Sequence, residues 1–161
     1  MALVSGLLVA CADTEVGSRD VVADPAPSQM ETVPSERASP GGPKRVVIDK
    51  TKQELRAYEG DQLVQQSEIS TGAQGRRTPN GTYEVGVKWR MHHSTIYDDA
   101  PMPYSVQVTG DYFIHGYHKV PDYPASHGCI RLPLSGANPA KQFFNWVEKD
   151  TTIEIVGEWQ G

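Results

Sequence analysis

The sequence predicts a mostly-β domain, folded as a sandwich or a barrel-like sheet, with one helix packed near its C-terminal end and a disordered tether before it. Three observations lead to this fold class. Short segments rich in β-branched residues alternate apolar and polar positions between turn formers. Only one segment has the cap and the apolar side of a helix, which argues against repeated βαβ units. The first aromatic residue of the chain is Tyr58, so the N-terminal part lacks the residues of a core.

The start of the chain resembles a bacterial lipoprotein signal. Residues 1–10 are apolar, yet they fall short of the roughly 20 residues that a membrane-spanning helix needs. The segment ends in LVAC, which looks like a lipobox whose cysteine receives the lipid. We therefore expect residues 1–11 to be a signal with Cys11 lipidated, and Ala12, in place of an aspartate, points to the outer membrane. The alternative is that this segment is an inert remnant.

Residues 12–43 are expected to be a disordered linker. They hold prolines and small polar residues without an aromatic residue or an apolar period, so they cannot bury enough surface to offset the entropy of ordering. The linker is acidic, whereas residues 44–156 carry equal numbers of basic and acidic side chains. This balance argues against the basic footprint of a nucleic-acid-binding protein. We expect a folded domain at residues 44–157, anchored by lipid and facing the periplasm.

The predicted strands follow one another with turns between them. Hairpins are expected around Gly60-Asp61 and Gly110-Asp111, because these residues suit the tight turn. Residues 70–81 are dominated by turn formers and are expected to be a loop, with Thr78–Gly81 as a proline turn. The expected strands are residues 45–49, 54–59, 62–70, 82–90, 104–109, 112–115 and 151–156.

The one convincing helix begins after Asn138, whose side chain can cap it. Pro139 suits the first helical position, where a backbone N–H is not needed. Phe143, Phe144 and Val147 recur at helical spacing and form its apolar side. We therefore expect this helix to pack against the sheet.

The stretch PASHGCIRLP, residues 124–133, gathers reactive groups. In an extended segment alternate side chains share a face, so His127, Cys129 and Arg131 project together. Gly128 between them has no side chain, which lets a substrate backbone approach closely. If Cys11 carries lipid, the cysteine of this stretch is a free thiol.

Cys129 needs a base to become a nucleophile. A free cysteine has a pKa of about 8.5, and a neighbouring imidazole can take its proton and stabilise the thiolate. Either His127 or His115 could be that neighbour, and spacing alone does not choose between them. This layout is typical of cysteine acyl transfer.

A metal site is the sharpest competing use of these side chains. His115, His118, His127 and Cys129 could supply four ligands, but zinc ligands usually come in tighter pairs. We therefore expect no metal and no cofactor.

The remaining histidines are expected in solvated positions. His118 reads as a loop residue. His92 and His93 are expected on the surface of a loop or flap, with lining of the substrate groove as the alternative. Arg76 and Arg77 are expected to be solvated in a basic loop that could help to capture an anionic substrate.

The segment IHGYHKVPDYPASHGCIRL closely resembles the signature of the L,D-transpeptidase catalytic domain, the YkuD family. That family carries a His-Gly pair followed by Ser-His-Gly-Cys, an aliphatic residue and Arg. The resemblance covers residues 44–157 and includes the opening residues 46–72, the TPNG turn and the MPYSVQV segment from Met102. It implies a mostly-β fold with a helix beside the sheet. It also implies attack on the bond between an L-centre and a D-amino acid in peptidoglycan stem peptides.

The resemblance implies a role for each residue of the site. Cys129 would be the nucleophile, His115 the proton donor and acceptor, and His127 an orienting and polarising residue. The backbone amides of Gly128 and Cys129 would face the developing oxyanion. Arg131 would hold a carboxylate of the stem peptide or brace the loop. The expected substrate-binding residues are Arg131, Ser126, Gly116 and Tyr104.

The implied reaction forms a thioester on Cys129 with release of D-Ala. The acyl group then passes to an amine, either of a second stem peptide or of a lysine on an envelope protein. Three alternatives stay open: a carboxypeptidase that uses water, an enzyme that cleaves linked lipoprotein from the wall, and a silent wall-binding module. We expect the protein to be a monomer.

Overall fold

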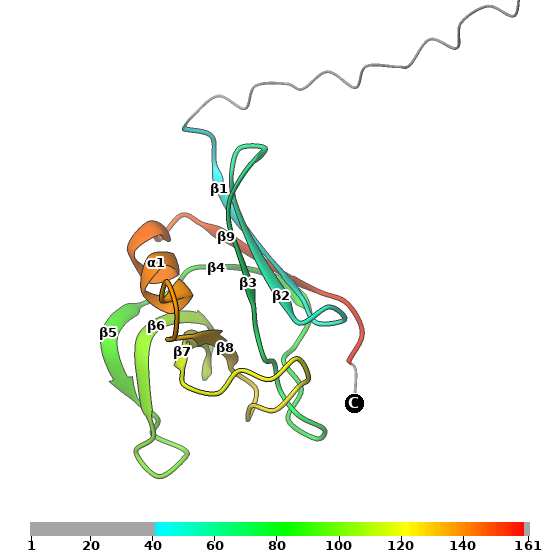
Figure 1. The fold of residues 1–161 in the computed structure, drawn as a ribbon, viewed down its shortest axis with the longest axis vertical. Coiled ribbons are helices and arrows are strands. Elements are labelled where there is room, and N and C mark those ends of the chain that lie inside the picture. The colour runs from blue at the N-terminus through cyan, green and yellow to red at the C-terminus, as the bar shows by residue number, and fades with distance from the viewer. Residues whose placement is uncertain (1–40, 160–161) are drawn as a thin grey trace, which may run out of the picture. The chain divides into compact units, whose positions relative to one another are not determined.

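The computed structural model describes residues 41–159, which form two β-sheets and one short α-helix (Figure 1). The predicted mostly-β fold with one helix is confirmed. The predictions for residues 1–40, lipidation of Cys11 among them, lie outside the described residues. The elements are β1 (Lys44–Asp49), β2 (Glu54–Glu59), β3 (Gln62–Glu68), β4 (Gly81–Glu84), β5 (Lys88–His93), β6 (Pro101–Thr109), β7 (Tyr112–Tyr117), β8 (Ile130–Pro133), α1 (Pro139–Trp146) and β9 (Thr152–Val156).

The two sheets share one apolar core. The first has the strand order β3-β2-β1-β9-β4, and the second has the order β5-β6-β7-β8. Both sheets and α1 contribute to a single buried cluster, whose fully buried members include Ile48, Ile114, Ile130 and Phe143. Removal of these apolar faces from water is the main favourable term in the folding of the domain.

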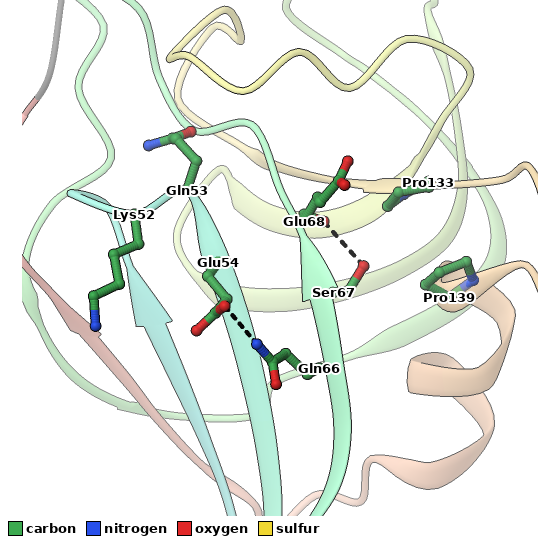
Figure 2. Close-up of a pocket in the computed structure, with 8 residues that line it drawn as sticks. All are labelled: Lys52, Gln53, Glu54, Gln66, Ser67, Glu68, Pro133 and Pro139. Atoms are coloured by element: carbon green, nitrogen blue, oxygen red, sulfur yellow. Dashed lines mark hydrogen bonds between the residues drawn. The ribbon is translucent and has the colours of Figure 1, made fainter.

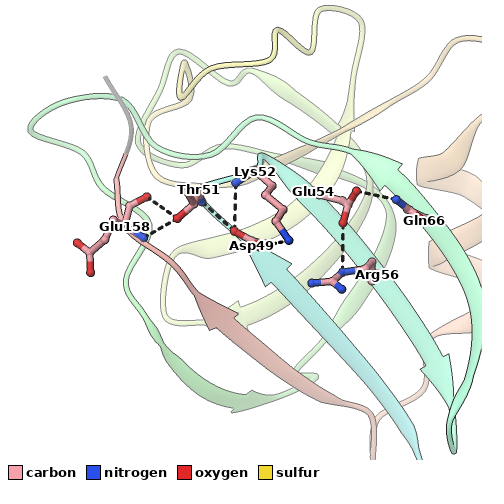
Figure 3. A network of polar contacts seen from close by, with 7 residues as sticks. All are labelled: Asp49, Thr51, Lys52, Glu54, Arg56, Gln66 and Glu158. Atoms are coloured by element: carbon pink, nitrogen blue, oxygen red, sulfur yellow. Dashed lines mark hydrogen bonds and ion pairs between the residues drawn. The ribbon is translucent and has the colours of Figure 1, made fainter. Parts of the chain in front are cut away.

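The turn from β1 to β2 also anchors the C-terminal end of the described chain. Asp49 Oδ1 accepts the backbone N–H groups of Thr51 and Lys52 at 3.0 and 3.1 Å, so the aspartate side chain closes the turn (Figure 3). The N–H of Glu158, just beyond β9, donates to Thr51 Oγ1 at 2.9 Å. Since β9 pairs in parallel with β1, these contacts attach the end of β9 to the start of the neighbouring hairpin.

Residues 82–90 are two strands, and the prediction of a single strand is wrong. β4 pairs with β9 in the first sheet, whereas β5 pairs with β6 in the second. The chain crosses between the sheets at Gly86, where a Cβ would lie 2.7 Å from Gln107 Oε1. Apolar residues keep alternating through the crossing, so the pattern hides the change of sheet.

The helix forms where the sequence predicts it. Asn138 Oδ1 accepts the N–H of Lys141 at 3.0 Å, and Pro139 is the first helical residue. Phe143 and Val147 are fully buried against the sheets. Within residues 41–159, no helix is long and apolar enough to cross a membrane.

Candidate active site

A cavity of about 630 Å³ opens beside β7 and β8. Its walls come from residues 94–100 between β5 and β6, called here the hairpin end, and from residues 125–131, called here the cysteine segment. Cys129, His115, His127 and Arg131 all line it. The structure therefore brings together the two histidine motifs that the sequence separates.

Strand register explains why these side chains meet. β7 and β8 run parallel, with Ile114 opposite Ile130 and His115 opposite Arg131. The two isoleucines are fully buried in the core, so His115 and Arg131 occupy the other face of the sheet. Cys129 lies two residues before Arg131 and shares that face. The alternation predicted for the cysteine segment thus places the thiol on the histidine side.

Burial disfavours ionisation of Cys129. It raises the pKa of the thiol; a hydrogen bond from the Phe113 backbone and the nearby Arg131 act in the opposite direction, and the Asp111 carboxylate adds to the rise. Cys129 Sγ donates to the Asp111 carbonyl at 3.7 Å. The resting sulfur is therefore a protonated thiol.

His115 is neutral for a related reason. The side chain is only 5% exposed, and burial lowers its pKa to about 4, with further lowering by Arg131 and His92 and an opposing contribution from the Gly116 carbonyl. Nδ1 lies 3.0 Å from that carbonyl, and a carbonyl can only accept, so Nδ1 carries the proton. Nε2 is then the ring nitrogen left with a lone pair for the thiol proton.

These two pKa directions differ from the ionised pair expected from the sequence. A protonated thiol and a neutral imidazole form the resting site, and no hydrogen bond joins Cys129 to His115 in the described structure. Formation of a thiolate and an imidazolium in this buried place carries a desolvation cost. Proton transfer to His115 is therefore expected to accompany attack on a bound substrate instead of preceding it.

His127 packs against the hairpin end. It is exposed, and its ring stacks on Tyr97 with centroids 4.3 Å apart. The Arg76 guanidinium lies 5.7 Å from the other ring of this stack, that of Tyr97. The pKa of His127 is lowered, first by the water that its ring loses on packing against the protein and then by the positive charges of Arg76 and Arg131. Its contacts thus favour a role in closing the cavity more than a role in polarising the thiol.

Ser126 and Gly128 hold the shape of the cysteine segment. Ser126 Oγ donates to the Cys129 carbonyl at 2.5 Å and accepts the Gly128 N–H at 3.0 Å. Ser126 as a whole is only 2% exposed. Ser126 thus lines the cavity with its hydroxyl already engaged in the turn. The Gly128 N–H is bound to that hydroxyl, so the prediction that this amide faces the oxyanion does not fit the structure.

Gly128 is glycine for a packing reason. Its φ is 122°, a conformation that residues with a side chain rarely adopt, and a Cβ would lie 2.9 Å from Tyr112 Cε1. The expectation that the missing side chain makes room for substrate therefore needs correction, since the ring of Tyr112 occupies the adjoining space.

Gly116 and Tyr104, both expected to bind substrate, do not line the cavity. A Cβ on Gly116 would lie 2.4 Å from Leu134 Cδ2 and 3.2 Å from Ala140 Cβ, so this residue faces α1 and not the cavity. Tyr104 packs on Phe144 of α1 with ring centroids 5.9 Å apart. Gly116 instead acts on the site through its carbonyl, which holds the His115 ring.

Arg131 follows the bracing alternative. Its Nη1 donates to the Ala125 carbonyl at 3.2 Å, and its Cζ lies 4.1 Å from the centroid of the Tyr117 ring. Both contacts fix the guanidinium at the edge of the cavity. The other N–H groups of the positively charged guanidinium could donate to a carboxylate bound there.

His92 lines the cavity, which is the less favoured of the two positions expected for it. It stacks on Trp89 at 4.6 Å and lies 5.1 Å from Phe113. In a regular strand, residues three apart face opposite sides. The neighbouring strand β6 is distorted at Tyr104, which has a φ of 56° and lies opposite Arg90, where the regular pairing of β5 with β6 is interrupted. This backbone distortion accompanies the break in alternation. Spacing could not reveal it.

The residues that support the cysteine segment come from residues 70–78, called here the support loop. Thr71 O accepts the N–H groups of Ala125 and Ser126 at 2.9 and 3.0 Å. Gln53 holds Thr71 in turn, since its Oε1 accepts the Thr71 N–H at 2.8 Å. Residues 70–78 read as an ordinary loop and turn in the sequence, because these contacts join segments far apart in the chain, residue 71 with residues 125 and 126 among them.

A second cleft, of about 460 Å³, lies on another part of the domain between β3, the end of β8 and the start of α1 (Figure 2). It is lined by Lys52, Gln53, Glu54, Gln66, Ser67, Glu68, Pro133 and Pro139. It contains neither a cysteine nor a histidine, so the cavity at Cys129 is the candidate active site. Among residues 41–159, no three His, Cys, Asp or Glu side chains are grouped to hold a metal ion.

Comparison with known proteins agrees with the fold and the motif. The model of the L,D-transpeptidase catalytic domain (YkuD) matches residues 43–155. No curated protein matches the chain. A crystal structure of an L,D-transpeptidase (Yku) from Stackebrandtia nassauensis is 25% identical with a TM-score of 0.67, covering 76% of this chain and 59% of that one. An L,D-transpeptidase from Xylanimonas cellulosilytica is 31% identical with a TM-score of 0.59, covering 72% of this chain and 61% of that one.

A more distant structure has the same fold. An Enterococcus faecium L,D-transpeptidase mutant is 22% identical with a TM-score of 0.63, covering 72% of this chain and 50% of that one. The chain thus spans less than two thirds of the length of each of these proteins. The family match covers more than half of the chain and includes both histidine motifs and the cysteine segment, and we conclude that the chain belongs to the L,D-transpeptidase catalytic domain family.

Proposed function

We propose that the protein is a cysteine-dependent L,D-transpeptidase that acts on peptidoglycan stem peptides. The observation that carries this proposal is the shared face of β7 and β8, on which Cys129, His115 and Arg131 line one cavity. Family membership supports the substrate class. A wall-binding module would have no use for a cavity-lining thiol beside a neutral imidazole.

The first half of the reaction forms a thioester. Cys129 Sγ attacks the carbonyl carbon of the third stem residue while His115 Nε2 takes the thiol proton. The resulting oxyanion is stabilised by a backbone amide at the cysteine. When the carbon–nitrogen bond to D-Ala breaks, His115 gives its proton to the departing amine. Because the pKa of His115 is held at about 4, the imidazolium formed in the first step is a strong enough acid to give up this proton readily.

The second half transfers the acyl group. An acceptor amine attacks the thioester, His115 takes a proton from that amine, and the carbon–sulfur bond breaks. The leaving sulfur then recovers the proton from the imidazolium, which restores the resting thiol. With water as the acceptor the same steps give a carboxypeptidase, so the acceptor decides between transfer and hydrolysis. A lysine of an envelope protein is a further acceptor within this proposal.

Arg131 is the proposed contact for a carboxylate of the donor stem. Its guanidinium is held by Ala125 and Tyr117 at the edge of the cavity, so little side-chain freedom is lost when an anion binds. The proposed envelope location and lipid anchor rest on the residues around Cys11, and the monomeric state is likewise a proposal.

The test is acylation of the full chain. The protein is incubated with a tetrapeptide stem or with a carbapenem, and its intact mass is recorded beside that of Cys129→Ala. We expect an adduct on the native protein and none on the variant. A folded native protein that forms no adduct with either compound would overturn the enzyme assignment. Analysis of products from digested cell wall then separates new cross-links, protein attachment and trimming.

A further inference from the structure

The support loop and the cysteine segment are joined along most of their lengths. Ser70 and Arg131 exchange two backbone hydrogen bonds, Ser70 N to Arg131 O at 3.1 Å and Arg131 N to Ser70 O at 2.9 Å. The N–H of Ala73 donates to the Ser126 carbonyl at 2.9 Å. These contacts bring residue 78 beneath the peptide that precedes Cys129.

Thr78 is the side chain at this junction. It is 1% exposed. Its Oγ1 donates to the Gly128 carbonyl at 2.7 Å and accepts the N–H of Gly72 at 3.0 Å. Its own carbonyl accepts from Lys50 Nζ at 3.0 Å. The hydroxyl therefore has one donor and one acceptor in fixed positions, and it cannot turn without leaving a buried polar group unpaired.

This arrangement fixes the direction of the next backbone amide. The peptide between Gly128 and Cys129 is planar and trans, so its N–H points opposite to its C=O. With the carbonyl held by Thr78, the Cys129 N–H points away from the support loop. Among the turn and loop hydrogen bonds of residues 41–159, none takes this N–H, whereas the Gly128 N–H is bound to Ser126 Oγ.

The hydrogen bond from Thr78 to the Gly128 carbonyl matters because glycine is conformationally permissive. A glycine at φ 122° can rotate its following peptide with little steric resistance. Oxyanion stabilisation depends on donors that are already aimed before the charge develops. An external contact must therefore supply the rigidity that glycine lacks.

We propose that Thr78 is a positioning residue that aims the Cys129 amide at the oxyanion formed when the sulfur attacks a carbonyl. This inference rests on the proposed acyl-transfer function. It assigns a chemical consequence to a buried hydroxyl in a segment that otherwise reads as a proline turn. Thr78 does not touch the substrate and acts only through the Gly128–Cys129 peptide.

The experiment compares two reactions of the same thiol in the full chain. Imipenem acylates sulfur through attack on a carbonyl, which creates an oxyanion. Iodoacetamide alkylates sulfur by displacement of iodide, which creates none. In Thr78→Val we expect the acylation rate constant to fall roughly 10- to 100-fold. This is less than the loss caused by removing an oxyanion donor outright, because the Cys129 amide stays in place but is less well aimed. The alkylation rate and the affinity for imipenem before acylation should each change by less than about threefold, because neither depends on an oxyanion and Thr78 contacts neither reagent.

Matched variants separate positioning from stability. Thr78→Ser keeps the hydroxyl and should restore the ratio of acylation to alkylation. Thr151→Val removes another buried threonine hydroxyl, one that accepts the Glu148 N–H at 3.0 Å and does not line the cavity. It should lower the melting temperature without changing the ratio. If Thr78→Val does not fold, Thr78→Ala and Thr78→Ser give the same comparison.

Each outcome bears on one proposal. If the native protein is not acylated at all, the proposed function fails. If the native protein is acylated and the folded Thr78→Val or Thr78→Ala variant keeps the native ratio, the positioning role is wrong. Equal losses in acylation and alkylation also overturn it, because they indicate general damage to the thiol. A Thr78→Ser variant as impaired as Thr78→Ala does so too.

Discussion

On one side of the cavity, the cysteine segment is bound to the support loop by hydrogen bonds that join residues 50 or more positions apart, such as Thr78 Oγ1 to Gly128 O. On the other side, the hairpin end bonds mainly to itself: Ser94 N donates to Ala100 O at 3.0 Å, and Tyr97 N donates to Ser94 Oγ at 3.0 Å. Ile96 there is 57% exposed. The hairpin end contacts the opposite wall through Tyr97, whose ring stacks on His127 and lies near the Arg76 guanidinium.

The two walls of the cavity therefore differ in how easily they open. Segments with long-range hydrogen bonds and buried side chains open only at high free-energy cost, whereas an exposed hairpin end opens at low cost. The wall that carries Cys129 is therefore suited to the preorganised chemistry proposed for it. The hairpin end is suited to admitting and sorting substrates. Changes in the two walls should accordingly affect different kinetic constants.

The largest expected effect is on chemistry at the rigid wall. In His115→Gln the acylation rate should fall by about 10² to 10⁴, the usual contribution of a general acid–base group. Affinity for the carbapenem before acylation should be little changed, because the ring acts on the proton. Stopped-flow or mass-resolved acylation at several carbapenem concentrations separates the two constants. A variant that loses affinity but acylates at the native maximal rate would show that His115 only binds substrate.

A second prediction concerns the stability cost of burying His115. Its folded pKa of about 4 lies below the ordinary histidine value of 6.5. Between these values the unfolded chain binds more protons, so the free energy of unfolding falls as pH falls. The loss should reach about 3 kcal/mol by pH 4 and should not grow further from this group below that pH. Denaturant titrations at pH 7.5 and at pH 4 measure this loss. If the drop is the same size in His115→Gln, the group is not its source.

The third prediction tests how tightly the rigid wall is packed. Gly128→Ala places a Cβ at positive φ and 2.9 Å from Tyr112 Cε1, which should cost about 1–3 kcal/mol of stability and slow acylation. Gly136→Ala is the matched control, since Gly136 also has a positive φ of 61° but nothing lies within 4 Å of its added Cβ. Thermal unfolding and acylation rates compare the two variants. Acylation slowed equally by both would argue against a role for packing on Tyr112.

The smallest effect is expected at the hairpin end. In Tyr97→Ala the stacking partner of His127 is removed, and this kind of aromatic contact contributes about 0.5–1.5 kcal/mol. We expect the donor KM or the pre-acylation constant for a carbapenem to rise several-fold, with the maximal acylation rate little changed. Steady-state and acylation kinetics measure both. A fall confined to the maximal rate would contradict the division between the walls.

Local pattern was enough to find most strands, the helix and the reactive segment. The Asn138-Pro139 start of α1 and the alternation through Cys129 and Arg131 depend on neighbours only a few residues away. The division of residues 82–90 was missed because alternation looks the same whichever sheet a strand joins. Gly116 and Tyr104 were assigned to substrate because motif position says nothing about the face that a residue presents.

The sequence by itself determined the family, the mostly-β class and the side chains able to carry the chemistry, since these follow from residue types and short spacings. Only the tertiary structure decided their state and their support. It buried His115 and Cys129, so that both favour the neutral form. It also placed the Thr78 hydroxyl against the Gly128 carbonyl, in the peptide before Cys129. Desolvation and long-range hydrogen bonds depend on packing between distant segments, and no local pattern encodes them.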